Sequence, residues 1–260
     1  MPRALIVGFF VALCAALLGV TLVLKRLSMI GDGLSHVGFG ALAVALALNW
    51  APLMVAMPVV MAAALLLLRL SENSSIKGDT AIALFSSSAL AIGLLVVNRG
   101  HVNVNISSYL FGSILAINSA DAVLSVVLAI GVLAVFMFFY HKIFAVVFDE
   151  EFVSATGLSA AFYKTVIGLM TAVTIVSGMR IMGTLLISSL VIFPGVSSMR
   201  VFGSFRGVTC GAMVISVINF FVGMIVSLTW NLQPGPSIVL VHTVVFAVIW
   251  LISGIKRHKG

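Results

Sequence analysis

ALIVGFFVALCAALLGVTLVL, residues 4–24, contains no charged residue and ends at Lys25-Arg26. A run of about 20 apolar residues crosses a bilayer as an α-helix, because hydrocarbon offers no partner for an unpaired backbone group. The run resembles the core of a signal peptide, but it is long and lacks a convincing small-x-small cleavage site. We therefore expect it to be retained as a first membrane span.

The rest of the chain has the same character. Of its 260 residues, 62% are hydrophobic and 8% are charged, against roughly 25% charged in an ordinary soluble domain. A water-soluble fold would lack the polar side chains to cover its surface. The composition therefore excludes a soluble globule and predicts an all-α, polytopic transmembrane helix bundle in a lipid bilayer.

We expect about nine spans in a single transmembrane domain that covers 1–260. Scanning for apolar runs broken by charge, Gly or Pro places them near 4–24, 28–49, 52–70, 79–98, 121–141, 163–180, 183–201, 207–230 and 236–255. The apolar stretch 163–199 is too long for one crossing, and we divide it at Gly178-Met179-Arg180. Because that division is uncertain from the sequence, the predicted number of spans ranges from eight to ten.

The positive charges predict the orientation of the chain. With the N-terminus outside and the C-terminus cytoplasmic, every Lys and Arg except Arg3, Arg99 and Arg180 lies on the cytoplasmic side. Cytoplasmic loops of membrane proteins carry this excess of basic residues. The formal charge of +7 is thus explained by topology, and because the basic residues form no face with interleaved aromatics, we expect no nucleic-acid partner.

Two connections are long enough to hold structure. The outer loop at 99–120 contains the apolar piece 107–113, which we expect to form a short helix at the outer interface. The cytoplasmic segment at 148–163 contains Asp149-Glu150-Glu151, the chain's cluster of acids.

Asp32 and His36 are ionisable residues inside a predicted membrane span. A carboxylate near the middle of a bilayer costs about 2.5–3.5 kcal/mol on insertion scales, so such residues usually serve a function. The spacing of four residues puts both side chains on one helical face. Carboxylate oxygen and imidazole nitrogen form a ligand set suited to zinc and acceptable to manganese or iron.

Two ligands are too few for a metal ion, but a symmetric dimer would present two Asp and two His around its axis. Gly31, Gly33, Gly38 and Gly40 leave room for a close neighbour. The alternative is that Asp32 caps the start of its helix and His36 bonds a nearby carbonyl.

Catalytic motifs are missing from the sequence. It has no GxxxxGKS or GxxxxGKT phosphate loop, no HExxH and no GxSxG. We therefore expect a transport subunit rather than an enzyme, with no permanently bound cofactor and with any ATP hydrolysis on a separate chain.

The run 25–36, KRLSMIGDGLSH, resembles the start of the second helix in the permease subunits of zinc- and manganese-importing ABC transporters. Further matches follow in the same order at 79–82, 109–113, 149–157, 182–194 and 235–237, so that the resemblance covers nearly the whole chain. Phe193-Pro194-Gly195-Val196 departs from the family, whose members often have Pro-Ala-Ala there.

The resemblance implies a multi-pass permease in a bacterial cell membrane that works by alternating access. The implied partners are a second copy of the chain, an ABC ATPase subunit and an extracellular metal-binding protein. It also implies that Asp32 and His36 line the path of the transported ion, Zn²⁺ in preference to Mn²⁺. The residues that would meet the ATPase are Asp149, Glu150, Glu151, Phe152, Ala155 and Gly157.

Two other functions stay open. A permease for a metal chelate, such as a siderophore or a corrinoid, would share the architecture but would need a wide cavity. A stand-alone secondary ion carrier would need no ATPase. Copurification of an ATPase, with uptake stimulated by ATP, would distinguish an importer subunit from a carrier.

Overall fold

The computed structural model describes residues 2–73, 78–99, 110–112, 118–184 and 186–257, and these residues contain helices and no strand. The first four helices are α1 (Pro2–Leu24), α2 (Ile30–Ala47), α3 (Pro52–Asn73) and α4 (Gly78–Arg99). The others are α6 (Ser119–Phe148), α7 (Glu150–Ala155), α8 (Ala160–Met182), α9 (Ile187–Met199), α10 (Phe205–Thr229) and α11 (Pro234–Arg257). The predicted all-α polytopic bundle is confirmed.

Within the described residues, eight helices are long and apolar enough to cross a membrane. The number lies within the predicted range of eight to ten, but the expected span at 183–201 is shorter than predicted. It is α9, whose 13 residues extend about 20 Å at 1.5 Å per residue, against a hydrocarbon core of about 30 Å. The predicted outer loop falls mainly on 100–109 and 113–117, which lie outside the described residues, and the orientation of the chain stays a prediction.

The predicted division of 163–199 is confirmed, but the break lies a few residues after Gly178-Met179-Arg180. Helix α8 continues through these residues and ends at Met182, and its C-cap Gly183 has a φ of 86°. Gly178 causes no break because its face packs against Ile187 and Val11. The helix ends where a left-handed backbone conformation, which glycine tolerates and other residues rarely adopt, turns the chain.

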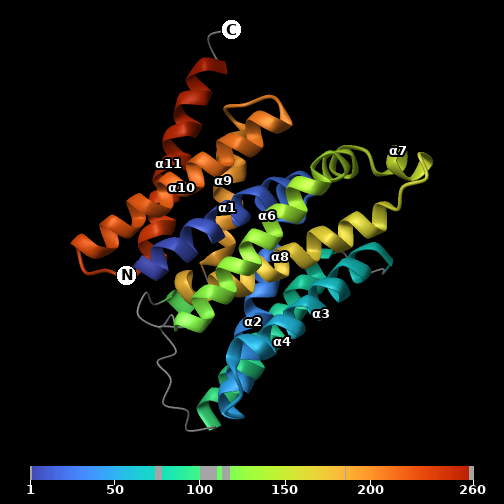
Figure 1. Cartoon of the computed structure of the whole chain (residues 1–260). Coiled ribbons are helices and arrows are strands. Elements are labelled where there is room, and N and C mark those ends of the chain that lie inside the picture. The colour runs from blue at the N-terminus through green and yellow to red at the C-terminus, as the bar shows by residue number, and fades with distance from the viewer. Residues whose placement is uncertain (1, 74–77, 100–109, 113–117, 185, 258–260) are drawn as a thin grey trace.

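Helix α1 lies at the centre of the bundle (Figure 1) and packs against α6, α8, α9 and α10. Helices α2, α3 and α4 form a group on one side of it, and α9, α10 and α11 form a group on the other. The small helix α7 lies at one end, between α6 and α8. Most of α1 is buried, which explains why its sequence is apolar on every face.

Glycine allows the backbones of α1 and α9 to touch. A Cβ atom on Gly19 would overlap the carbonyl oxygen of Val191, and one on Gly195 would lie 3.3 Å from the backbone of Gly19. Close backbone contact of this kind is typical of helices in membranes, where association depends on packing rather than on apolar burial.

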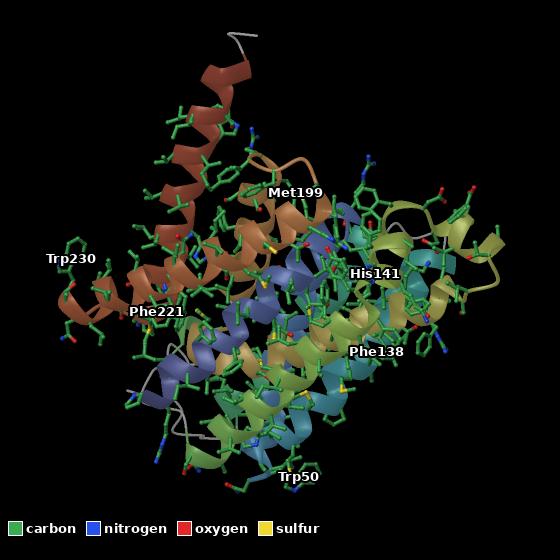
Figure 2. The ribbon with its side chains drawn as sticks, turned by 45° about the horizontal axis from the view of Figure 1, so that its top comes forward. Trp50, Phe138, His141, Met199, Phe221 and Trp230 are labelled. Atoms are coloured by element: carbon green, nitrogen blue, oxygen red, sulfur yellow. The ribbon has the colours of Figure 1, made fainter. Side chains whose placement is uncertain are left out.

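The outer surface of the bundle is apolar. The side chain of Phe138 on α6 is 81% exposed, and Trp50 and Trp230 are exposed at the ends of α2 and α10. Figure 2 shows Trp50 and Trp230 at the periphery of the molecule. Exposed apolar side chains suit contact with lipid tails, and tryptophan is enriched where the bilayer meets water.

Candidate metal path and coupling segment

Helix α2 begins at Ile30 and carries the predicted Asp32–His36 pair in its first two turns. Its N-cap is Met29, which makes no capping bond with its side chain. Asp32 therefore does not cap the helix, and its carboxylate lies on the side of α2 that faces His36 and α9.

The carboxylate of Asp32 meets polar groups from two helices. Its Oδ2 atom lies 3.5 Å from Nε2 of His36. Its Oδ1 atom accepts a hydrogen bond of 3.4 Å from the hydroxyl of Ser188 on α9. The two residues that the spacing predicts on one face are thus close together, and Ser188 is an addition that the sequence did not indicate.

The pair is only partly enclosed. The His36 side chain is 13% exposed and the Asp32 side chain 36%, and Nδ1 of His36 is buried without a hydrogen-bond partner. The carboxylate therefore combines an open side with a neighbouring imidazole nitrogen. Both groups can donate electron pairs to a cation if the imidazole is neutral.

Helix α9 begins beside this carboxylate. Its N-cap Leu186 makes no capping bond with its side chain, and Ser188 is in its first turn. The first N–H groups of a helix lack intrahelical partners and carry a partial positive charge, which stabilises a nearby carboxylate. Interrupted helices of this kind direct their ends at ion sites in several transporter folds.

Small residues bring the surrounding helices close to the pair. A Cβ on Gly31 would lie 4.0 Å from Ser188, and one on Gly33 would lie 2.7 Å from Ile82 on α4. The close approach that the glycines predicted is therefore confirmed. Among the described residues, no group of three or more His, Cys, Asp and Glu side chains gathers at one point, so one copy offers a cation two strong ligands.

The predicted coupling segment contains α7, whose two faces differ. Val153 is buried in a cluster with Val146, Ala160 and Tyr163, whereas Phe152 is 62% exposed. The side chain of Asp149 caps the helix by accepting a hydrogen bond of 2.8 Å from the backbone N–H of Phe152. The predicted residues Glu151, Phe152, Ala155 and Gly157 are exposed together.

Glu150 turns toward its own chain. Lys25 donates a hydrogen bond of 3.1 Å to its Oε2 atom, and Lys164 donates one to Oε1. Burial raises the pKa of the Glu150 carboxyl, but the hydrogen bonds and charges of Lys164 and Lys25 outweigh burial and hold the pKa below its ordinary value. Glu150 is therefore an anionic anchor for α7.

Of the other histidines, His242 is buried on α11, with Nδ1 2.9 Å from the carbonyl oxygen of Ile238. His141 is exposed on α6, and His101 and His258 lie outside the described residues.

Known proteins are similar to this chain in sequence, and a solved structure is similar to it in fold. The model of the ABC 3 transport family matches residues 1–253. The high-affinity zinc uptake system membrane protein ZnuB of Buchnera aphidicola is 29% identical over 96% of this chain and 95% of its own. The manganese transport system membrane protein MntC of Listeria monocytogenes is 25% identical over 97% of this chain and 90% of its own.

A solved structure, PsaBC from Streptococcus pneumoniae in complex with Fab, has a chain that superposes with a TM-score of 0.86 at 26% identity. The match covers 96% of this chain and 90% of that one. The family match spans nearly the whole sequence, and the helical fold agrees with it. The chain is therefore a multi-pass bacterial membrane permease that belongs to the ABC 3 transport family.

Proposed function

We propose that this permease translocates a divalent metal ion by alternating access and that the ion passes the Asp32–His36 pair. The observation that carries the proposal is the partly open carboxylate at the start of α2, with an imidazole nitrogen 3.5 Å away. A bare cation would compensate for the cost of holding this carboxylate at membrane depth. The relatives named for zinc and manganese systems support a metal substrate.

The active unit proposed here contains two copies of the chain. One copy supplies two ligands, whereas two copies related by a twofold axis would supply two carboxylates and two imidazoles. An extracellular binding protein would deliver the ion. A separate ATPase would dock on the exposed face of α7 and supply the energy for the conformational change.

The ligand set does not separate zinc from manganese, because selectivity for these ions depends on geometry and availability as well as on ligand type. A transit site must also release its ion. The sequence-based preference for zinc stays a prediction.

Uptake of radioactive zinc and of radioactive manganese by cells that express the permease with its transport partners tests the proposal. Asp32→Asn and His36→Ala should each abolish uptake of the transported ion at unchanged membrane expression. Asp121→Asn and His141→Ala on α6 are matched controls that should retain it. Near-normal uptake in both α2 variants would refute the proposed path.

A further inference from the structure

The carboxylate of Glu150 joins two parts of the chain that are distant in sequence. Lys25, 3.1 Å from Oε2, directly follows α1 and begins the corner that leads into α2. Lys164, the partner of Oε1, lies in the first turns of α8. The side chains of the two lysines are 18% and 17% exposed, whereas that of Glu150 is 40% exposed, so this ionic cluster is shielded from solvent on its lysine side and open to solvent at the carboxylate.

The corner after α1 is held by its own backbone hydrogen bonds. The N–H of Lys25 donates to Thr21 at 3.0 Å, that of Leu27 to Leu22 at 2.8 Å, and that of Ile30 to Leu27 at 3.0 Å. Backbone hydrogen bonds therefore hold the chain from Lys25 to the first turn of α2. A displacement of Lys25 is passed on to the turn that carries Asp32.

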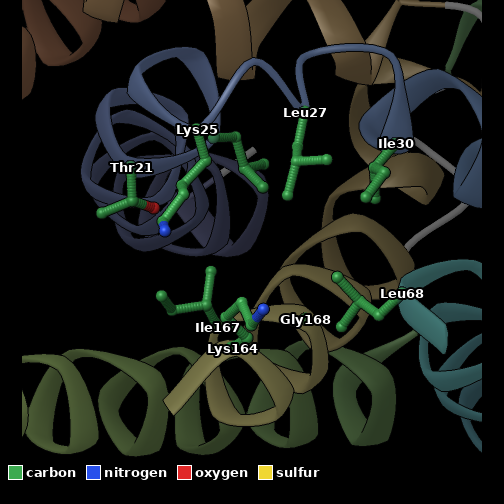
Figure 3. A pocket seen from close by; sticks show the side chains of 9 residues that line it. Thr21, Lys25, Leu27, Ile30, Leu68, Lys164, Ile167 and Gly168 are labelled. Carbon is green, nitrogen blue, oxygen red and sulfur yellow. The ribbon is translucent and has the colours of Figure 1, made fainter. Parts of the chain in front are cut away.

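Beside the cluster, the corner and α8 are separated by a pocket. It is lined by Thr21, Lys25, Leu27 and Ile30 on one side and by Lys164, Ile167 and Gly168 of α8 on the other. Figure 3 shows Lys25 and Lys164 on these facing walls. At this pocket, side chains of the corner and of α8 do not fill the space between them. The Glu150 carboxylate of α7 links the two walls, because it accepts hydrogen bonds from Lys25 and from Lys164.

We propose that Glu150 is a positioning residue that transmits displacement of α7, through Lys25, to the start of α2 and the Asp32–His36 pair. The inference rests on the proposed function, in which the ATPase docks on α7. The two lysines have different roles in it. Lys25 connects α7 to the ion path, whereas Lys164 connects α7 to the helix that directly follows it.

The test separates transport from hydrolysis in the permease–ATPase complex reconstituted in liposomes. The quantity measured is zinc or manganese ions transported per ATP hydrolysed. We expect this ratio to fall severalfold in Glu150→Gln and Lys25→Met, while ATP hydrolysis and complex assembly persist. Lys25→Arg should restore the ratio. Lys164→Met should leave the ratio unchanged.

Hydrogen–deuterium exchange of the full-length permease alone provides a second readout. Backbone exchange across 25–36 should rise in Glu150→Gln and Lys25→Met but not in Lys164→Met. An unchanged exchange pattern, or an unchanged transport ratio in Lys25→Met, would overturn the link. If the exchange pattern changes as expected but the wild-type complex transports neither ion, the proposed function fails and the mechanical link stands.

Discussion

The hydroxyl of Ser188 lies 3.4 Å from Oδ1 of Asp32, although 156 positions separate the two residues in the sequence. The contact joins the start of α9 to the start of α2. It occupies one carboxylate oxygen, while His36 lies beside the other. The environment of the carboxylate is therefore set by two helices, of which only α2 carries a recognisable motif.

Ser188→Ala is expected to shift the affinity for the transported ion without abolishing uptake. A hydrogen bond to a charged group contributes about 1.5 kcal/mol at the lower end of its range, which corresponds to roughly a tenfold change in an equilibrium constant. The distance of 3.4 Å makes this an upper bound. Titrating uptake against metal concentration measures the shift, with Ser189→Ala as the neighbouring control. Complete loss of uptake would instead place the hydroxyl among the direct ligands.

Gly19→Ala is expected to destabilise the permease strongly. The added methyl group would overlap the backbone carbonyl of Val191, and overpacking of this kind costs about 1–3 kcal/mol or more. Gly131→Ala on α6 is the matched control, because nothing lies within 4 Å of the added atom and alanine favours a helix by about 1 kcal/mol. Thermal unfolding in detergent should show a lower midpoint for Gly19→Ala only. Equal midpoints would contradict the close contact of α1 and α9.

Phe152→Ala should weaken binding of the ATPase while leaving the stability of the permease unchanged. The ring is 62% exposed on the chain alone, so its loss removes few internal contacts, and a buried aromatic anchor is a common hot spot at interfaces. Pull-down of the ATPase measures binding. Phe138→Ala, on the face of α6 that contacts lipid, is the control and should bind normally. Normal binding by Phe152→Ala would move the docking surface away from this face of α7.

Val153→Ala tests the other face of α7. Removing two buried methyl groups costs about 1–3 kcal/mol, and α7 is only 6 residues long. We therefore expect faster proteolysis and faster hydrogen exchange at α7, with a smaller change in the unfolding midpoint of the whole chain. Exchange at α7 equal to that of the wild type would show that the ionic cluster alone holds the helix.

The ion pairs of Glu150 with Lys25 and Lys164 should persist in mild acid. Because the pKa of Glu150 is lowered from its ordinary value of 4.5, its contribution to stability is fully present above about that pH and is lost as the pH falls through the lower, folded value. The unfolding midpoints of wild type and Glu150→Gln should therefore differ by a constant amount from neutral pH to about pH 5 and converge below it. A difference that disappears near pH 6 would contradict the lowered pKa.

The sequence predicts most of the membrane helices, because a segment that crosses a lipid bilayer must be apolar and nearly free of charge. The run 4–24 predicted α1, and the spacing of Asp32 and His36 placed them on one face. The end of α8 at Met182 lies two residues beyond the predicted 180, because the break depends on the backbone conformation of Gly183 and not on the charge of Arg180. Ser188 and the Lys25–Glu150 pair were missed because nothing local distinguishes them, and only the packing of distant segments brings them together.

The touching backbones of Gly19 and Val191 determine which parts of the permease can move. Helices so close cannot slide without a steric clash, so α1 and α9 form one rigid body, and Ser188 is fixed to it. Asp32 lies beyond the corner at 25–29, at the start of α2. Any opening between Ser188 and Asp32 therefore requires the start of α2 to move relative to this rigid body.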